Sequence, residues 1–431
     1  MKITVVGLGK IGLPLGVQFA SAGHVVYGAD IAPSVVAAVS AGIPPFPGEH
    51  QLPEKLAEAV ASRCLRPTTD TVSAVETSDV VVVVVPLSID SQGIPEFDAV
   101  DSATRDVARG LQPGTLVLYE TTLPVGTTRT RLAPMLESST GLRPGVDFFL
   151  AFSPERVYSG RVFADLARYP KLVGGLDEAS TQRAIEFYSK VLSFDERPEL
   201  AEGNGVWDMG SPEAAELAKL AETTYRDVNI ALANQFALYA QRIGVDIHQV
   251  IEACNSQPFS HLHRPGIAVG GHCLPVYSQI YAHGDPHASV TRAAREANAA
   301  MPSKIIDLLE HAAGGLDGRR ALVLGAAYRG GVKEAAFSGV FATAAALRER
   351  RAEPLVHDPL FTAEELTELG LTAYRQGESV DCVVVQADHS EYRNLSSADI
   401  PGVKTVFDGR GVLDPARWTD VDLLVLGRIG H

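Results

Sequence analysis

Cysteine is scarce in this chain, which has only four among its 431 residues. Such a low density excludes a scaffold held together by disulfides and suits a reducing compartment. Acidic side chains outnumber basic ones, and the net charge of -15 argues against binding nucleic acid through a broad basic surface. No apolar run reaches the roughly 18 residues of a membrane helix, and the first residues, MKITVVGLGK, lack a signal-peptide layout. We therefore expect a cytoplasmic protein without nucleic-acid or membrane partners.

The hydrophobic residues follow the rhythm of alternating strands and helices. A hydrophobic fraction of 46% over this length predicts two or three domains with sizeable cores. Short β-branched runs, spaced to admit a helix between most of them, indicate buried parallel sheets. These runs are MKITVVGLG, HVVYGADI, SDVVVVVVP, GTLVLYETT and DFFLAFSP, then GRRALVLGAAY, EPLVHDP, DCVVVQADH, KTVFDGR and VDLLVLG. The sequence thus predicts an α/β protein with two Rossmann-like, doubly wound parallel sheets.

A long helix is expected between the two sheets. The chain has neither Pro nor Gly between Pro212 and Gly244, and Pro212 fits the first helical turn after Ser211 as a cap. We predict a helix of about 30 residues here. The predicted domains are a Rossmann-like domain, a central helical domain and a second, C-terminal Rossmann-like domain. Their expected ranges are 1–200, 201–314 and 315–431.

The strongest local motif is VVGLGKIG, in which Gly7, Gly9 and Gly12 have the spacing G-x-G-x-x-G between a strand and a helix. The first glycine allows a tight turn, the second lets the backbone approach a pyrophosphate, and the third lets the helix pack closely on the strand. Asp30 ends the next strand, where a carboxylate accepts hydrogen bonds from a ribose diol and repels a 2′-phosphate. The motif predicts NAD rather than NADP, the alternative being a glycine turn without a ligand.

Cys273 differs from the other cysteines because it lies in the turn-like stretch GGHCLPVY. The other three sit within helix-like or strand-like runs: Cys64, Cys254 and Cys382. Flanking glycines let a substrate approach, and exposed NH groups in such a turn can stabilise a thiolate or an oxyanion. A small residue in a tight turn is one alternative. A metal site is another, although the spacing matches no common zinc pattern; its other ligands would be His261, His263 and His272.

Lys219 and Thr223 are four residues apart in the predicted long helix and therefore share a face. Lys219 lies in the alanine-rich and leucine-rich run EAAELAKLAE. It is either a surface lysine whose stem covers apolar neighbours, or an ammonium that points into a cleft and stabilises an oxyanion. Periodicity does not separate these two interpretations.

Nine segments, in order over nearly the whole chain, resemble the nucleotide-sugar 6-dehydrogenases, the family of UDP-glucose and UDP-N-acetylmannosamine dehydrogenases. These segments are VVGLGKIGLPLG, VVVVVP, ETTLPVGTT, FSPERV, KLVGG, ELAKLAETTYRDVNIALANQ, PGIAVGGHCLP, VLGAAYRGG and HDP. FSPERV and TYRDVNIALAN look more like the branch that acts on N-acetylhexosamine nucleotides than like the UDP-glucose branch.

The resemblance implies a four-electron oxidation of the sugar C6 alcohol to a carboxylate with two NAD in succession. By resemblance Cys273 is the nucleophile that forms a thiohemiacetal and a thioester, Lys219 is the catalytic lysine, and Thr122 and Glu155 position water and assist hydrolysis. Residues that match cofactor-binding positions are Gly7, Leu8, Gly9, Lys10, Ile11, Gly12, Asp30, Val85, Pro86 and Thr122. Residues that match substrate-binding positions are Glu155, Arg156, Val157, Lys219, Arg264, Gly270, Tyr328, Arg329 and Arg410. The family also uses the long helix as a dimer interface, which implies a homodimer. From the spacing of the histidines and Cys273 we expect no metal site.

Three positions depart from the family pattern. This chain has Thr223 where the family usually has Asn, Tyr277 where it usually has Asp, and Ala336 where it normally offers an Arg to the cofactor. Lys333 is a candidate to replace the charge of that Arg. Thr223 is a candidate to assist Lys219 in stabilising the oxyanion. These departures bear on the oxyanion, on hydrolysis and on cofactor binding, not on the fold.

Three alternative functions stay open at this point. One is the UDP-glucose 6-dehydrogenase. Another is a two-electron dehydrogenase of the 6-phosphogluconate or 3-hydroxyacid type, which needs neither a cysteine in a loop nor a second nucleotide-binding domain. The last is a non-catalytic NAD-binding protein, which would tolerate any residue at the site positions.

Overall fold

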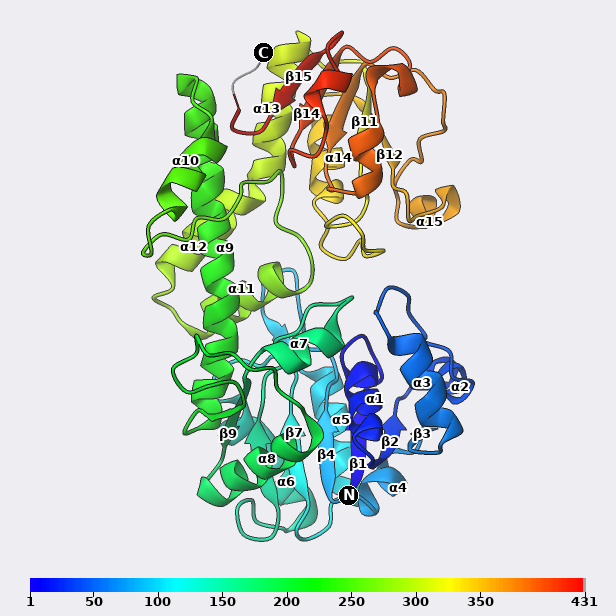
Figure 1. Ribbon diagram of the computed structural model, residues 1–431, viewed down its shortest axis with the longest axis vertical. Coiled ribbons are helices and arrows are strands. Elements are labelled where there is room, and N and C mark those ends of the chain that lie inside the picture. The colour runs from blue at the N-terminus through cyan, green and yellow to red at the C-terminus, as the bar shows by residue number, and fades with distance from the viewer. Residues whose placement is uncertain (429–431) are drawn as a thin grey trace. The chain divides into compact units, whose positions relative to one another are not determined.

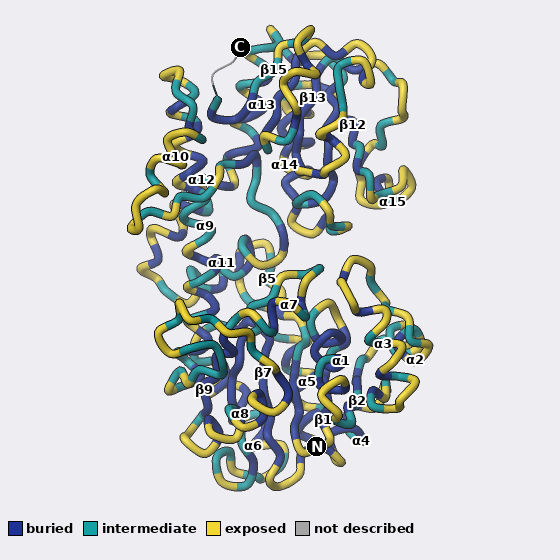
Figure 2. The backbone as a smooth tube through the Cα atoms, in the orientation of Figure 1, coloured by how far each residue is buried: buried dark blue, intermediate teal, exposed yellow. Residues whose placement is uncertain are grey.

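The computed structural model describes residues 1–428, which form two compact units divided between Glu222 and Thr223 (Figure 1). Each unit contains one large β-sheet whose central strands are fully buried. In Figure 2 the strands of each sheet run as dark, buried segments. Strands buried on both faces are expected where helices cover a parallel sheet, so the two predicted Rossmann-like cores are confirmed.

The first unit holds an eight-stranded sheet in the order β10-β9-β8-β7-β4-β1-β2-β3. Its strands are β1 (Lys2–Val6), β2 (Val25–Ala29), β3 (Leu65–Thr68), β4 (Val80–Val83), β7 (Leu116–Tyr119), β8 (Phe149–Phe152), β9 (Lys171–Gly175) and β10 (Val206–Asp208). All neighbours are parallel except β8 and β9, which are antiparallel. The strand order reverses between β1 and β4, and ligands of such sheets bind at the carboxyl ends of the strands beside that point.

Helices and a small hairpin complete the first unit. They are α1 (Gly12–Ser21), α2 (Pro33–Ser40), α3 (Leu52–Ala61), α4 (Thr71–Glu76), β5 (Ser88–Ile89), β6 (Pro95–Glu96), α5 (Asp98–Gly110), η1 (Thr128–Leu132), α6 (Ala133–Thr140), α7 (Val162–Arg168) and α8 (Glu178–Val191). The apolar sides of α1, α3 and α8 join the buried strand residues in one core.

Helix α9 (Pro212–Ile243) has 32 residues and confirms the predicted long helix. The Ser211 hydroxyl accepts a hydrogen bond from the Ala214 backbone NH at 3.2 Å, as expected of a cap. The first eleven residues of α9 belong to the first unit and the rest to the second.

The second unit contains a five-stranded, wholly parallel sheet in the order β12-β11-β13-β14-β15. Its strands are β11 (Arg320–Leu324), β12 (Glu353–His357), β13 (Cys382–Val385), β14 (Thr405–Asp408) and β15 (Asp422–Val425). Its helices after α9 are α10 (Ile247–Asn255), α11 (Cys273–Gly284), α12 (Ser289–Ala299), α13 (Met301–Ala313), α14 (Val340–Glu349), α15 (Ala363–Glu368), η2 (Ser390–Asn394), η3 (Ser397–Asp399) and η4 (Pro415–Arg417). Here the strand order reverses between β11 and β13, which places the ligand-binding edge at their carboxyl ends.

Strands β3, β9 and β10 were not among the predicted runs, and β9 breaks the predicted all-parallel pattern. Strand β9 ends in two glycines, and a Cβ on Gly174 would lie 1.9 Å from the carbonyl oxygen of Ser211. Because the backbone at Ser211 approaches so closely, position 174 must be glycine. Glycine is uncommon in strands, so it makes β9 hard to recognise from the sequence. Strand β3 is obscured by Pro67, which an edge strand tolerates.

Candidate active site

The glycine-rich turn joins β1 to α1 in the first unit. Gly7 has a φ of +96°, and a Cβ there would lie 2.9 Å from the carbonyl oxygen of Val84. A Cβ on Gly12 would lie 1.9 Å from the carbonyl oxygen of Gly7, so the packing of the turn itself requires both glycines. A Cβ on Gly9 would meet no atom within 4 Å. Gly9 therefore leaves open space at the N-terminus of α1, where a pyrophosphate can approach the backbone.

Asp30 follows β2 and lies beside this turn. Its carboxylate accepts hydrogen bonds from the Leu8 NH at 2.8 Å and from the Ala32 NH at 2.9 Å, one on each oxygen. Each oxygen keeps a lone pair for a ribose hydroxyl. The predicted neighbours Lys10 and Ile11 complete the turn, with Lys10 exposed and Ile11 at the N-cap of α1.

Val85 and Pro86 follow β4, the strand next to β1. A Cγ of Val85 lies 3.4 Å from the Cβ position of Gly7, and the Val85 carbonyl accepts a hydrogen bond from the Thr121 hydroxyl at 2.5 Å. Val85 is half-buried and Pro86 is exposed. The turn, Asp30 and the segment after β4 therefore surround one edge of the sheet and fit a dinucleotide.

The Asp30 carboxylate should make the wild-type protein prefer NAD over NADP by at least about tenfold, or 1.4 kcal/mol. NADP loses the hydrogen bonds between the ribose hydroxyl and Asp30, and its 2′-phosphate is repelled by the carboxylate. Asp30→Asn removes the charge with little change of shape and should reduce that preference. Asp70→Ala is the matched control, because Asp70 also accepts a backbone NH, that of Ser73, but only at the N-cap of α4. The measurement is kcat/KM with each cofactor; equal use of both by wild type contradicts the assignment.

A buried ionic cluster lies farther along the same sheet edge, where β7 and β8 end and the antiparallel strand β9 begins. The Lys171 ammonium donates hydrogen bonds to Glu120 at 2.7 Å and to Glu155 at 2.8 Å. The Tyr188 hydroxyl donates to the other oxygen of Glu120 at 2.7 Å. The side chains of Glu120, Lys171 and Glu155 are 0%, 4% and 9% exposed, so this cluster reaches the surface through Glu155.

Burial and mutual attraction give the two carboxyl groups different proton affinities. Burial raises the pKa of Glu120 to about 7, against the attraction of Lys171. Burial also favours the neutral form of Glu155, but the Lys171 ammonium, its hydrogen bond and the Arg156 NH lower the pKa of Glu155 overall. The two carboxylates raise the pKa of Lys171 despite its burial. At neutral pH Glu155 and Lys171 are therefore charged, and Glu120 is the group that titrates.

Helix α9 is tied to the loops that follow β7 and β8. Glu216 is fully buried and accepts hydrogen bonds from the Gly126 NH at 2.5 Å and the Thr128 NH at 2.9 Å. Glu222 accepts a hydrogen bond from the Arg156 guanidinium at 2.8 Å. Lys219 lies midway between Glu216 and Glu222, so this part of α9 is held against the loops that carry Thr122 and Glu155.

Lys219 is only 7% exposed, and Thr223 is completely buried. A lysine whose head reaches solvent from the helix surface is therefore excluded. Stabilisation of an oxyanion by Lys219 stays a prediction. Thr122 is likewise buried. The first unit thus brings Thr122, Glu155 and Lys219 to one edge of its sheet, while Thr223 is the first residue of the second unit.

Cys273 does not lie in a turn, as the sequence predicted, but is the first residue of helix α11. Pro275 follows within the first helical turn, where proline is tolerated because that turn needs no NH donor. All four cysteines lie in the described part of the chain, and only Cys273 is exposed. Within residues 1–428 no three His, Cys, Asp or Glu side chains are arranged to hold a metal ion.

The glycines before Cys273 are required by Tyr328, which follows β11 in the same unit. A Cβ on Gly271, whose φ is +82°, would lie 2.9 Å from the Tyr328 ring. A Cβ on Gly270 would lie 2.9 Å from the Tyr328 Cβ and 2.7 Å from the carbonyl oxygen of Phe337. The start of α11 is therefore fixed against the carboxyl end of the second sheet.

Arginines gather at that edge. Arg410, after β14, makes an ion pair with Asp388, after β13, at 3.2 Å, and Asp388 also accepts the Gly330 NH at 2.9 Å. The Arg329 Nε donates to the Tyr328 hydroxyl at 3.2 Å. Tyr328 and Arg329 follow β11 and Arg410 follows β14, the two strands on either side of β13, so Asp388 links the segments that carry the three predicted residues.

Two other predicted residues have different surroundings. Arg264 is exposed and lines a hollow of about 310 Å³ with residues of α10, including His248 and Glu252. Lys333 makes an ion pair with Glu365 at 2.5 Å and lies over the Phe361 ring. Its proposed contact with the cofactor remains a prediction.

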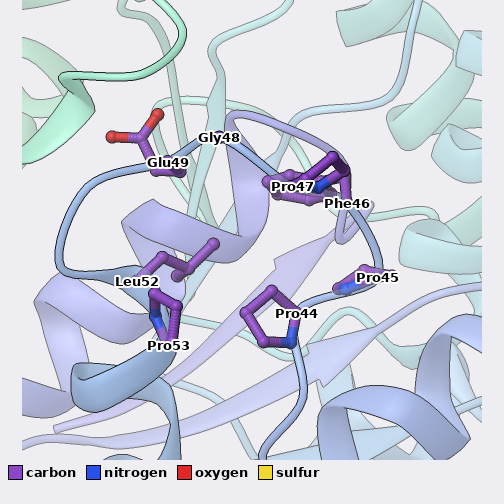
Figure 3. Close-up of a pocket in the computed structure, with 8 residues that line it drawn as sticks. All are labelled: Pro44, Pro45, Phe46, Pro47, Gly48, Glu49, Leu52 and Pro53. Carbon is purple, nitrogen blue, oxygen red and sulfur yellow. The ribbon is translucent and has the colours of Figure 1, made fainter. Parts of the chain in front are cut away.

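A hollow of about 360 Å³ in the first unit contains no predicted site residue. It is formed by a proline-rich loop, in which Figure 3 shows the Glu49 carboxylate pointing away from the proline rings. That carboxylate accepts hydrogen bonds from the Gly160 NH at 2.6 Å and the Val162 NH at 2.7 Å. Glu49 therefore fixes the end of the FSPERVYSG segment at the start of α7, although the sequence gave no sign of this role.

Three consecutive stretches of the chain match one family of enzymes. The NAD binding domain of the UDP-glucose/GDP-mannose dehydrogenase family matches residues 1–192, its central domain residues 213–300 and its UDP binding domain residues 322–415. The chain belongs to the UDP-glucose/GDP-mannose dehydrogenase family.

Similar proteins agree with this membership. A UDP-N-acetyl-D-mannosamine dehydrogenase from Pyrococcus horikoshii is 34% identical, with 96% of both chains covered. A UDP-N-acetyl-D-glucosamine 6-dehydrogenase from Pseudomonas aeruginosa is 29% identical over 93% of both chains. A solved structure of a UDP-D-ManNAc dehydrogenase from Pyrococcus horikoshii has a TM-score of 0.89, 31% identity and 99% coverage of both chains.

This member of the UDP-glucose/GDP-mannose dehydrogenase family is an NAD-dependent oxidoreductase that acts on a CH-OH group. The predicted cofactor and the resemblance to the N-acetylhexosamine branch are confirmed. The roles of individual site residues stay predictions. Sequence reasoning assigned no role to Glu120, Lys171, Glu216 and Glu222, although all four lie inside the segments ETTLPVGTT, KLVGG and ELAKLAETTYRDVNIALANQ that carry the resemblance.

Proposed function

We propose that the protein oxidises the C6 alcohol of a UDP-N-acetylhexosamine, of the UDP-ManNAc or UDP-GlcNAc type, to the carboxylate. The observation that carries this proposal is the position of Cys273, exposed at the start of a helix whose preceding glycines pack on Tyr328. An exposed sulfur beside a nucleotide-binding edge suits an aldehyde that must be held and oxidised again. Two-electron oxidation of an alcohol needs no such nucleophile.

The reaction follows from the chemistry of a thiol. The first oxidation removes a proton from the C6 hydroxyl and a hydride from C6, which leaves an aldehyde. The Cys273 thiolate adds to that carbon, and loss of a second hydride turns the thiohemiacetal into a thioester. Water then attacks the carbonyl carbon, the C–S bond breaks, and the acid and the thiolate are released. NAD, when bound, accepts the hydride in each oxidation.

Side chains on α9 and in the loops after β7 and β8 have the chemistry that these steps need. The Lys219 ammonium can stabilise the oxyanion of the thiohemiacetal, and the buried Thr223 hydroxyl can donate one further hydrogen bond. Thr122 and the ionised Glu155 are suited to hold the water and to take its proton. Arg156 and Val157 continue the segment that carries Glu155 and are proposed to contact the sugar.

The nucleotide would be held by the second unit. The Tyr328 ring can stack on the base, and Arg329 and Arg410 can donate charge-assisted hydrogen bonds to a diphosphate. Gly270 and Arg264 are proposed to contact the sugar. We also propose a division into three domains at 1–200, 201–314 and 315–431. A cytoplasmic location is proposed as well, and the four unpaired cysteines support it.

The deciding experiment is an assay of purified protein against UDP-linked and GDP-linked sugars, with NADH counted per sugar and the product identified by mass spectrometry. Two NADH per UDP-N-acetylhexosamine and a product that carries a carboxylate support the proposal. Turnover of UDP-glucose alone would favour the UDP-glucose 6-dehydrogenase, and one NADH with a free aldehyde would favour the two-electron class.

We also propose that the protein is a homodimer whose contact includes α9. Exposed apolar side chains recur along this helix at spacings of seven, four, three and four residues, which places them on one stripe. They are Tyr225, Leu232, Phe236, Tyr239 and Ile243.

Among the helices of residues 1–428, none combines the length and the apolar character that a membrane span requires.

Phe236→Glu places an unpaired charge in the middle of this stripe. We expect it to raise the dissociation constant of the dimer at least about a hundredfold, roughly 2.7 kcal/mol, because a buried charge without a partner is costly. Sedimentation velocity over a range of concentrations measures this. Val146→Glu, at a position that is 62% exposed in the first unit, is the control and should leave the dimer intact; a wild-type monomer would overturn the proposal.

A further inference from the structure

The ionic cluster at the end of β7 contains a second acid that the proposed mechanism does not use. Glu120 is completely buried behind Glu155, and both carboxyl groups are held by the same ammonium, that of Lys171. A carboxyl group of this kind is expensive to bury unless it is paired, and here two acids share one base. One excess proton site therefore lies directly behind the acid that is proposed to activate water.

We propose that Glu120 is a proton store for thioester hydrolysis, which receives the proton that Glu155 takes from the attacking water. This inference rests on the proposed function, because it requires a thioester on Cys273. The water O–H bond breaks as the oxygen bonds to the thioester carbon, and the proton goes to Glu155. It then passes to Glu120, which the Lys171 ammonium holds beside Glu155 at 2.7 and 2.8 Å, and this leaves Glu155 ionised and Glu120 neutral. The proton returns through Glu155 to solvent after the acid has left.

The surroundings of Glu120 fit this role from each element that contacts it. Lys171 from β9 and Tyr188 from α8 donate to its two oxygens, and Glu155 from the loop after β8 is the acid beside it. The Lys171 ammonium also lies 4.8 Å from the centre of the Tyr188 ring, which fixes both donors. With a pKa of about 7, Glu120 exchanges a proton near neutral pH, whereas Glu155 stays ionised. In this pair, Glu155 is thus the acid that accepts the proton from water, and Glu120 is the acid that holds it afterwards.

The test measures how fast the acyl group leaves Cys273, by chemical quench and mass spectrometry, as a function of pH. In wild type the rate should fall as the pH drops below about 7, because a protonated Glu120 cannot accept a second proton. Glu120→Gln keeps an oxygen for Lys171 but cannot store a proton. It should lose this dependence on pH and release the acyl group about tenfold more slowly, with the preceding NADH burst unchanged.

Tyr188→Phe separates proton storage from mere structural support. The Tyr188 hydrogen bond lowers the pKa of Glu120, so its removal should shift the pH dependence upward while retaining it. A Glu120→Gln variant that keeps the wild-type pH profile, or an unshifted profile in Tyr188→Phe, overturns the inference. NAD binding reports whether Glu120→Gln folds, and if it does not, Tyr188→Phe decides alone. Absence of any acyl-enzyme in wild type would instead refute the proposed function.

Discussion

Cys273→Ala should bind NAD as tightly as wild type and make no sugar acid. We expect acid formation to fall at least about a thousandfold, equivalent to roughly 4 kcal/mol of transition-state stabilisation. The second oxidation needs a carbon–sulfur bond that holds the aldehyde, and alanine has no atom that can form it. NAD binding is unaffected because the glycine turn and Asp30 lie in the other unit of the chain.

Cys254→Ala is the matched control, because Cys254 belongs to the same unit but is half-buried in α10. It should leave turnover largely intact, as should Ala at Cys64. Cys382 is buried in β13, where burial raises the pKa of its thiol and keeps it unreactive. Binding is measured by titration with NAD, and the product by mass spectrometry. Acid made by Cys273→Ala at the wild-type rate would remove this residue from the mechanism.

The parts of the fold that the sequence predicts are those governed by local pattern. Strands such as β4 and β13 are buried on both faces, so they appear as continuous apolar runs. Helix α9 is evident because no Pro or Gly interrupts it after its cap. The glycine turn is evident because the close packing of Gly7 and Gly12 allows no other residue.

What the sequence does not predict depends on contacts between distant segments. Lys171 meets Glu120 and Glu155 only because β9 runs antiparallel beside β8, and the glycines of β9 hide that strand. The burial of Lys219 likewise follows from the loops that Glu216 and Glu222 hold against α9. Helical periodicity places Lys219 on a face but does not say what covers that face.

The position at which α11 begins places Tyr277, where the family usually has Asp, close to Cys273 along the helix. Because the helix begins at Cys273, residues 273 and 277 are one turn apart and lie on the same face. The Tyr277 ring packs against His272, with ring centres 5.7 Å apart. The nucleophile therefore has a phenol, not a carboxylate, as its neighbour one turn along the helix.

We expect thioester hydrolysis to be the slow step in this enzyme. A phenol is neutral at pH 7 and cannot replace a carboxylate as a base, which leaves the activation of water to Glu155 and Thr122. Rapid mixing of enzyme, NAD and substrate should show a burst of NADH before the steady state, and quenched enzyme should carry the acyl group on Cys273. Tyr277→Asp restores a carboxylate one turn from the sulfur and should speed loss of the acyl group about a hundredfold.

Thr223→Asn is the companion variant, because it restores the other residue that the family usually has near Lys219. An amide donates a hydrogen bond as the threonine hydroxyl does, so we expect it to change the oxidation steps by less than about tenfold and to leave hydrolysis slow. The contrast between the two variants assigns the slow step to the missing carboxylate. A wild-type enzyme that shows no burst would contradict slow hydrolysis. Release of one NADH and a free aldehyde per sugar would mean that Tyr277 and Thr223 have changed the reaction itself, since a two-electron dehydrogenase has no acyl group to hydrolyse.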